Sequence, residues 1–322
     1  MKAIRINEFG DPEVLKYQEI QVPEPQKDQV LIRIQAIGIN YVDIYKRTGR
    51  YSLDLPATPG EEAAGVIEKV GPEVSEVKPG DRVAYANQTG SYAEFAVVPT
   101  EKLIPVPDEV EIKVAAATML QGMTAHYLSC STFPIHEGHT ALVHAAAGGV
   151  GLLLTQLIKN FGGRVIGTVS TEQKAELARA AGADEVILYT REDFETETLK
   201  RTDGKGVDVV YDSVGKTTFE KSMNCLKPRG YLVLYGQASG PAPAIDPQIL
   251  NRKGSIFLTR PSLGHYIDDP LELMQRSRDL FKWITSGSLH VRIDQTFPLA
   301  EATKAHRYME ARKSKGKVLL IP

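Results

Sequence analysis

The sequence predicts a two-domain α/β protein in which a β-rich domain precedes a doubly wound parallel sheet. Three observations support this class. At 322 residues, the chain is longer than one ordinary hydrophobic core supports. Roughly the first 100 residues hold short alternating apolar runs, separated by turn signals such as Pro79-Gly80-Asp81. From residue 140 onward, short apolar strands alternate with amphipathic helices, as in a parallel sheet.

Strands at residues 30–36 and 64–70 suggest a compact, partly open barrel. A helix is expected at residues 110–129, which are rich in Ala, Met and Leu and contain no proline. The second domain should then contain strands at 141–145, 164–169, 185–188, 207–211 and 231–235, and helices at 150–161 and 171–181, the latter closed by Gly182. A last strand at 317–321 is expected to rejoin the first domain. The expected domains are therefore residues 1–124, completed by 291–322, and residues 125–290.

Composition excludes several classes. The chain is 42% hydrophobic and 24% charged, and its formal net charge is −2, so no global field attracts nucleic acid or an anionic membrane. No apolar run approaches the roughly 18 residues of a membrane span, and residues 1–10 lack the apolar stretch of a signal peptide. Only two cysteines occur, which favours a reducing, cytoplasmic location over a disulfide framework.

A glycine-rich turn predicts dinucleotide binding. Residues 140–151 read TALVHAAAGGVG, which places Ala146, Gly148 and Gly151 at the three positions of the Rossmann fingerprint. Gly148 lets the backbone approach a pyrophosphate, and Gly151 lets the helix pack closely on the strand. Ala146 replaces the first glycine, but the preceding strand and following helix supply the context that the motif needs. The residues expected to contact the cofactor here are Ala147, Gly148, Gly149, Val150 and Gly151.

The end of the next strand predicts which nicotinamide cofactor binds. An NAD site places Asp or Glu roughly 20 residues beyond the glycines to hold the ribose hydroxyls. This chain has Val169 there, followed by Ser170, Thr171 and Lys174. Hydroxyl groups and a cation, in the absence of a carboxylate, favour binding of the 2′-phosphate on the adenosine ribose. The sequence therefore predicts NADPH as the cofactor. Alternatively, Lys174 is an ordinary solvated helix residue.

Several ordered motifs carry a family resemblance. They include AIGINYVDIYKRTGRY (36–51), PGEEAAGVIEKVG (59–71), HAAAGGVG (144–151), VVYDSVG (209–215) and ILNRKGSIFLTRPSL (249–263). With these motifs the chain resembles the zinc-free quinone oxidoreductases, including zeta-crystallin, of the medium-chain dehydrogenase/reductase superfamily. The resemblance implies a GroES-like β-barrel catalytic domain and a Rossmann cofactor domain, with the active site in the cleft between them. It also implies a homodimer paired through the Rossmann sheets.

The resemblance also implies that no metal is used. Asn40 stands at the Cys position of the catalytic zinc pattern and Glu61 at the His position, and the four clustered cysteines of a structural zinc lobe are absent. His136 and His139 are interpreted as surface histidines. Reduction of a quinone suits such a site, because the developing charge is delocalised over the ring. Conjugated enals and enones are the competing acceptors.

The resemblance points to the catalytic residues Asn40, Tyr45, Tyr51 and Arg260. The two tyrosines are expected to donate to a quinone oxygen or to stack on its ring; alternatively, they pack the mouth of the barrel. Arg47 is interpreted as a solvated charge. Arg260 either orients the substrate or forms a salt bridge.

Further cofactor contacts follow from the resemblance and from strand ends. Lys317 is expected to reach the cofactor, the alternative being an exposed strand lysine. The complete set beyond the glycine turn is Asn40, Thr124, Ser170, Lys174, Tyr189, Ser213, Tyr235, Gly236, Gln237, Asn251 and Lys317.

The sequence thus predicts a zinc-independent, NADPH-dependent quinone reductase that transfers hydride, or alternatively electrons one at a time, directly to the quinone. The alternatives are an NADPH-dependent alkenal or enone reductase, and a non-catalytic NADPH- or RNA-binding protein.

Overall fold

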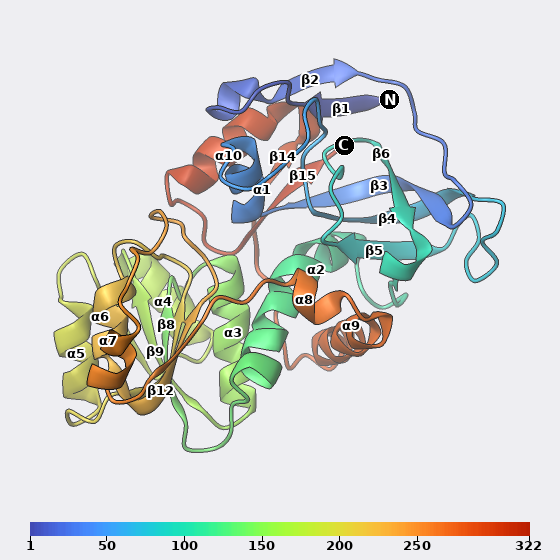
Figure 1. Ribbon diagram of the computed structural model, residues 1–322. Helices are drawn as coiled ribbons and strands as arrows, with labels where there is room; N and C mark the ends of the chain where they lie inside the picture. Colours follow the sequence, from blue (N-terminus) through green and yellow to red (C-terminus); the bar gives the residue numbers. More distant parts are fainter. The chain divides into compact units, whose positions relative to one another are not determined.

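A computed structural model describes all 322 residues, and these divide into two compact units (Figure 1). The first unit comprises Met1–Met123 and Ile267–Pro322, and the second comprises Thr124–Tyr266. The first boundary lies next to the expected residue 124, but the return to the first unit occurs at 266/267 rather than near 290. The reason is helix α9 (Pro270–Thr285), which the sequence pattern did not assign to the first unit. Its fully buried Leu280 packs where Gly122 has no Cβ.

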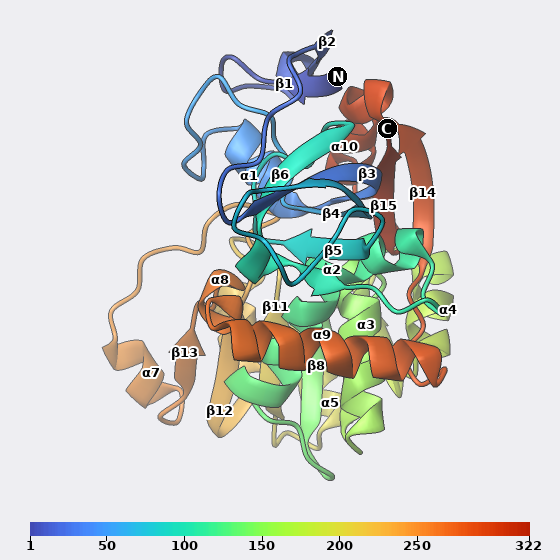
Figure 2. The ribbon, with the colours of Figure 1, turned by 90° about the vertical axis from the view of Figure 1, so that its right-hand side faces the viewer.

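The first unit is built around a seven-stranded sheet. The strand order is β14-β15-β3-β4-β5-β7, with β6 also paired to β3, while β1 and β2 form a separate hairpin. The strands are β1 (Lys2–Arg5), β2 (Lys16–Glu19), β3 (Gln29–Ile39), β4 (Glu62–Val70), β5 (Arg82–Ala86), β6 (Phe95–Pro99), β7 (Ile104–Pro105), β14 (Ile293–Pro298) and β15 (Lys317–Ile321). The last strand, β15, pairs antiparallel with β3 and so lies in the sheet of the first unit (Figure 2).

The helices of the first unit begin where capping side chains favour them. At α1, the Asp43 carboxylate accepts from the Asn40 backbone N–H, at 2.8 Å. At α9, the Asp269 carboxylate accepts from the Leu271 N–H, and Pro270 occupies the first turn. The elements are η1 (Pro12–Val14), α1 (Tyr41–Arg47), η2 (Thr100–Lys102), α2 (Ile112–Tyr127, which continues into the second unit), α9 (Pro270–Thr285), η4 (Leu299–Glu301) and α10 (Ala302–Glu310).

The second unit is a doubly wound, fully parallel sheet. Its strand order, β10-β9-β8-β11-β12-β13, is the 3-2-1-4-5-6 order of dinucleotide-binding sheets. The strands are β8 (Thr140–His144), β9 (Arg164–Val169), β10 (Glu185–Leu188), β11 (Val207–Asp212), β12 (Leu226–Leu234) and β13 (Phe257–Thr259). Buried aliphatic side chains such as Leu142, Ile166 and Leu232 fill the core. Because the strands are parallel, all their carboxyl ends lie along one edge.

Helices cover both faces of this sheet, with α3 on one face and α5 and α6 on the other (Figure 1). The Thr171 hydroxyl caps α4, and Gly182, with φ +102°, follows its end as expected. The elements are η3 (a π-helical turn, Leu128–Thr132), α3 (Gly149–Asn160), α4 (Glu172–Ala180), α5 (Phe194–Arg201), α6 (Phe219–Asn224), α7 (Gln248–Arg252) and α8 (Gly264–Ile267, which reaches the boundary). None of the helices has both the length and the apolar character needed to span a membrane.

Candidate functional site

In the first unit, the structure brings the two predicted tyrosines together at helix α1. The rings of Tyr45 and Tyr51 meet edge-on, with their centroids 5.2 Å apart. The loop between them is fixed because the Tyr45 carbonyl accepts hydrogen bonds from the backbone N–H groups of Arg50 and Tyr51, at 2.9 and 3.1 Å. Tyr45 is buried and Tyr51 half-buried. The pair is thus held as a rigid aromatic corner at the end of α1.

The Asn40 side chain, at the start of α1, is held by hydrogen bonds on both sides of its amide. Its oxygen accepts from the Lys317 ammonium at 2.9 Å and from the Gln121 amide at 3.3 Å. Its nitrogen donates to Glu62 Oε1 at 2.7 Å. A Cβ at Gly38 would overlap the Glu62 carboxylate, so the glycine makes room for this arrangement. Asn40 and Lys317, both predicted site residues, therefore lie side by side.

Lys317 and Glu62 form an ion pair that is almost completely closed to solvent. Their side chains are 1% and 0% exposed. Burial lowers the pKa of Lys317, and the Glu62 carboxylate opposes that shift. The other Glu62 oxygen accepts from the Leu120 N–H, at 2.6 Å. The interpretation of Lys317 as an exposed strand lysine is wrong. The apolar run around it on β15 places it inside the unit.

Glu61, at the His position of the zinc pattern, pairs with a second ammonium group. Its Oε1 accepts from the Lys46 Nζ at 2.5 Å and from the Thr89 hydroxyl at 2.7 Å, and Lys46 also donates to Thr89 at 2.9 Å. Asn40 likewise faces an ammonium group. An amide oxygen and a carboxylate that both bind ammonium groups do not form a zinc donor set. No group of three or more His, Cys, Asp or Glu residues is arranged to hold a metal ion.

A directed chain of hydrogen bonds runs from Arg47 in α1, through His306 in α10, back to Asp43 in α1. Arg47, which can only donate, lies 3.1 Å from His306 Nδ1, so this nitrogen accepts. His306 Nε2 therefore donates to the Tyr92 oxygen at 3.0 Å, and the Tyr92 hydroxyl donates to Asp43 Oδ2 at 3.0 Å. Arg47 also pairs with Glu310, at 2.5 Å, and is 1% exposed. The interpretation of Arg47 as a solvated charge is wrong, because its acidic partner lies on a distant helix.

Two of these buried groups have strongly shifted pKa values. Burial, reinforced by the nearby Glu61 charge, raises the pKa of Asp43 to about 8. Burial and the adjacent Arg47 lower the pKa of His306 to about 3. Hence His306 is neutral at physiological pH. Asp43 differs from Glu61, Glu62 and Glu310, because each of those three carboxylates forms an ion pair with a lysine or an arginine.

Asp43→Asn is expected to change how stability depends on pH. The folded protein holds a proton on Asp43 up to about pH 8, whereas the unfolded chain releases it near the ordinary value of 3.8. Rising pH across this window therefore destabilises the wild type through this group but not the variant. Urea unfolding between pH 4 and pH 9 should show the free-energy difference shifting in the variant's favour up to about pH 8 and then levelling. A difference that does not vary with pH would contradict this assignment.

In the second unit, the predicted glycine turn lies at the carboxyl end of β8. Gly148 caps α3, and a Cβ there would lie 3.1 Å from the Ala145 carbonyl oxygen. A Cβ at Gly151 would overlap the same oxygen and lie 2.8 Å from the Ala146 Cα. Ala147 is buried. This turn thus has the close strand-to-helix approach and the helix N-terminus that fit a dinucleotide pyrophosphate.

The remaining predicted residues of this unit lie mostly at the same carboxyl edge. Ser170 follows β9 and Tyr189 follows β10, and the two turns are joined by hydrogen bonds, one from the Thr190 hydroxyl to the Ser170 carbonyl at 3.0 Å. Ser213 and Gly236 are in close contact, since a Cβ on Gly236 would lie 2.5 Å from the Ser213 carbonyl oxygen. The predicted residues elsewhere are Thr124, buried in α2, Asn251, exposed in α7, and Arg260, exposed after β13.

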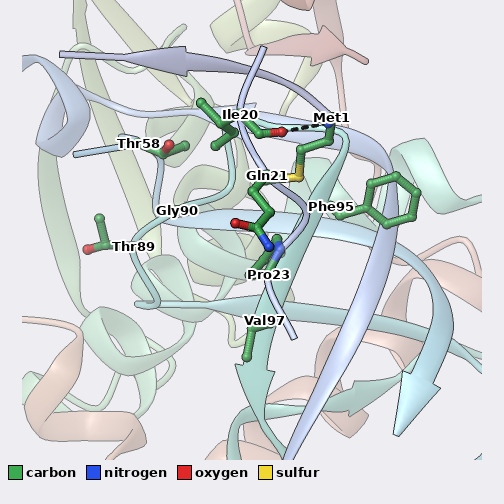
Figure 3. Close-up of a pocket in the computed structure, with 10 residues that line it drawn as sticks. Met1, Ile20, Gln21, Pro23, Thr58, Thr89, Gly90, Phe95 and Val97 are labelled. Atoms are coloured by element: carbon green, nitrogen blue, oxygen red, sulfur yellow. Dashed lines mark hydrogen bonds between the residues drawn. The ribbon is translucent and has the colours of Figure 1, made fainter. Parts of the chain in front are cut away.

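A separate small pocket lies among Met1, the loop that follows β2, and β6 of the first unit (Figure 3). It has a volume of about 200 Å³, and the Met1 amino group at its wall donates to the Ile20 carbonyl oxygen at 2.7 Å. Thr89, the partner of Glu61 and Lys46, also lines it. None of the predicted site residues does.

A GroES-like unit and a doubly wound unit with a glycine turn after its first strand define the class of medium-chain dehydrogenases and reductases. Family models agree with this class. Residues 26–108 match the model described as an alcohol dehydrogenase GroES-like domain, and residues 181–320 match the model described as a zinc-binding dehydrogenase.

Full-length relatives are more specific. The chain is 46% identical to a quinone oxidoreductase of Pseudomonas aeruginosa, covering 100% of this chain and 99% of the relative. It is 42% identical to a 2-haloacrylate reductase of a Burkholderia species, covering 99% and 98%. The solved structure of the Escherichia coli quinone oxidoreductase complexed with NADPH is 42% identical and superposes with a TM-score of 0.98 over 100% of both chains. The chain belongs to the quinone oxidoreductase family of the medium-chain dehydrogenase/reductase superfamily, and it is an oxidoreductase.

Several residues of the site were not predicted from the sequence. The polar cluster of the first unit, meaning the buried hydrogen-bonded groups around Asn40 and Asp43, also contains Glu62, Gln121, Tyr92 and His306. The only signal for Glu62 was a second acidic residue at the start of an apolar strand. Asp43 was detectable, because an acidic residue three positions after Asn40 is typical of a capping box.

Proposed function

We propose that this protein is an NADPH-dependent quinone reductase that works without zinc. The observation that carries the proposal is the TM-score of 0.98 to a quinone oxidoreductase complexed with NADPH, with 42% identity over the whole chain. The glycine turn, the adjacent Ser170–Lys174 segment and the strand ends at Ser213 and Gly236 fit such a cofactor. When bound, NADPH supplies a hydride to the quinone.

The residues of this chain are assigned the following roles. The turn Gly148–Gly151 binds the pyrophosphate through backbone N–H groups at the start of α3, and Ser170 and Lys174 bind the 2′-phosphate. The hydroxyl groups of Tyr45 and Tyr51 donate to the quinone oxygen that becomes negative as hydride arrives. Lys317 and Glu62 hold Asn40, and with it the start of α1, in place. The reaction balances as quinone, NADPH and one proton giving hydroquinone and NADP⁺.

The test is the rate of NADPH oxidation, and separately of NADH oxidation, by chelator-treated protein with an o-quinone, a p-quinone and a 2-enal. Fast turnover of a quinone with NADPH supports the proposal. Binding of NADPH without turnover of any acceptor, or salt-dependent RNA binding that NADPH displaces, would replace it with a binding role.

A second candidate is reduction of an activated alkene. The observation that favours it is the 42% identity to a 2-haloacrylate reductase over nearly the whole chain. The same hydride donor and the same tyrosines serve this reaction, with charge moving to the substrate's carbonyl or carboxylate oxygen. Turnover of the 2-enal or of 2-chloroacrylate, with no turnover of quinones, would establish it.

Lys174→Ala is expected to weaken NADPH binding about fivefold to tenfold and to leave NADH binding unchanged, because only NADPH carries the 2′-phosphate. Fluorescence titration of each cofactor checks this. Lys205→Ala is the matched control: this exposed lysine precedes β11 and lies at the opposite edge of the same sheet. Equal losses of affinity for NADPH and NADH, or an equal loss of NADPH affinity in the control, would show that Lys174 does not bind the 2′-phosphate.

We also propose a cytoplasmic homodimer. The edge strand β13 carries Phe257, which is 48% exposed and stacks on Tyr231 at a centroid distance of 4.5 Å. An exposed aromatic side chain on a sheet edge with unpaired backbone groups favours pairing with a second copy. Light scattering of the wild type and of Phe257→Lys tests this, and a monomeric wild type would refute it.

A further inference from the structure

A buried hydrogen-bonded chain lies beneath the carboxyl edge of the second unit's sheet. His144 ends β8, Thr168 is the penultimate residue of β9, Asp212 ends β11, and Ser222 lies in α6. All four are at most 1% exposed. His144 Nδ1 lies 2.9 Å from the Thr168 hydroxyl, His144 Nε2 lies 3.0 Å from the Ser222 hydroxyl, and Ser222 lies 3.0 Å from Asp212 Oδ2. The chain thus joins three neighbouring strands.

The direction of every bond in this chain can be deduced. The Asp212 carboxylate only accepts, so the single hydroxyl hydrogen of Ser222 is used on Asp212. His144 Nε2 must then donate to Ser222, and Nδ1 of the neutral ring accepts from Thr168. Burial lowers the pKa of His144 and so favours the neutral ring. Each group has one role, and removing any hydroxyl leaves a buried partner unsatisfied.

Each end of the chain fixes a turn that the proposed cofactor uses. The other Asp212 oxygen accepts from the backbone N–H groups of Val214 and Gly215, at 2.8 and 3.0 Å, and so shapes the turn that contains Ser213. Asp212 Oδ2 also accepts from Thr218, at 2.7 Å, at the start of α6. His144 directly precedes the glycine turn, and Thr168 lies two residues before Ser170.

We propose that His144, Thr168, Ser222 and Asp212 are positioning residues that hold the three cofactor-binding turns in one fixed arrangement. None of them is assigned a cofactor contact. The inference rests on the proposed NADPH function, because the turns matter as a set only if one ligand spans them. The preorganised turns bind such a ligand without first having to be ordered.

Thr168→Val tests this hydrogen-bonded chain, because it removes the Thr168 hydroxyl while keeping the shape of the side chain. We expect the Kd for NADPH to rise about tenfold, with an unchanged kcat at saturating NADPH, because an unsatisfied His144 lets the turns move apart. Thr168→Ser, which keeps the hydroxyl, should restore binding. The matched control is Thr155→Val: Thr155 is buried in α3 of the same unit, and its hydroxyl has no hydrogen-bond partner. Equal NADPH affinity in Thr168→Val and Thr155→Val would overturn the proposal.

NMR without cofactor separates this inference from the proposed function. Nitrogen-15 spectra of the wild type should show that His144 is protonated at Nε2 and unprotonated at Nδ1. In Thr168→Val, the amide signals of Val214 and Gly215, on the far side of the chain, should shift together with those of the glycine turn. The opposite tautomer, or shifts confined to the neighbours of Thr168, would refute the proposed positioning role even if NADPH binds. A wild type that shows these signals but binds no NADPH would instead refute the proposed function.

Discussion

Lys317→Met is expected to lower the free energy of unfolding by about 3–5 kcal/mol, the usual cost of removing one partner from a buried ion pair. The Glu62 carboxylate, which is 0% exposed, would be left inside the first unit without its ammonium partner. The Asn40 amide would also lose a donor at 2.9 Å. For a unit of this size, the transition of the first unit should fall by roughly 10 °C in thermal unfolding followed by circular dichroism.

Two further variants make this result specific. Lys304→Met removes the lysine of an exposed pair with Glu301, and it should cost less than about 1 kcal/mol. Adding Glu62→Gln to Lys317→Met removes the stranded charge and should recover much of the loss. If Lys317→Met costs no more than Lys304→Met, the buried pair does not stabilise the first unit more than an exposed pair does.

Gly151→Ala is expected to abolish measurable NADPH binding and to destabilise the second unit by about 1–3 kcal/mol, because the new Cβ overlaps the Ala145 carbonyl oxygen and forces α3 away from β8. The N–H groups at the start of α3 would move with the helix. Titration calorimetry and thermal unfolding measure the two effects.

Gly148→Ala provides the contrast for this prediction. Its Cβ would meet only the Ala145 oxygen, at 3.1 Å, which a small shift relieves. We expect weaker NADPH binding, because the methyl group lies where the pyrophosphate approaches, but little change in thermal stability. Equal stability losses in the two variants would mean that Gly151 has no special part in helix packing.

The second unit was the more predictable from sequence, because its information is local. Parallel strands buried on both faces read as short apolar runs, and Thr171 and Gly182 mark the ends of α4 within a few residues. Strands at 164–169 and 185–188 coincide with β9 and β10. The assignment of α9 could not be made in this way, because it depends on the packing of Leu280 against Gly122.

The polar cluster of the first unit was less predictable because its partners are remote in sequence. Lys317 and Asn40 are 277 positions apart, and Arg47 reaches Glu310 across 263. Whether a charged residue is solvated or buried depends on such a partner, so Arg47 was misread. The roles of Tyr45, Tyr51 and the other site residues remain predictions that the variants above test.

The pairing of β15 with β3 has a consequence for the order of folding. Residues such as Val318 and Ile39 can meet only after the whole of Thr124–Tyr266 has been looped out between them. The second unit is continuous in sequence and its strands pair with near neighbours, so it can collapse first and shorten the loop that the barrel must close. We therefore expect refolding in two kinetic phases, with protection of β8 and β9 amides appearing before protection of β3 and β15.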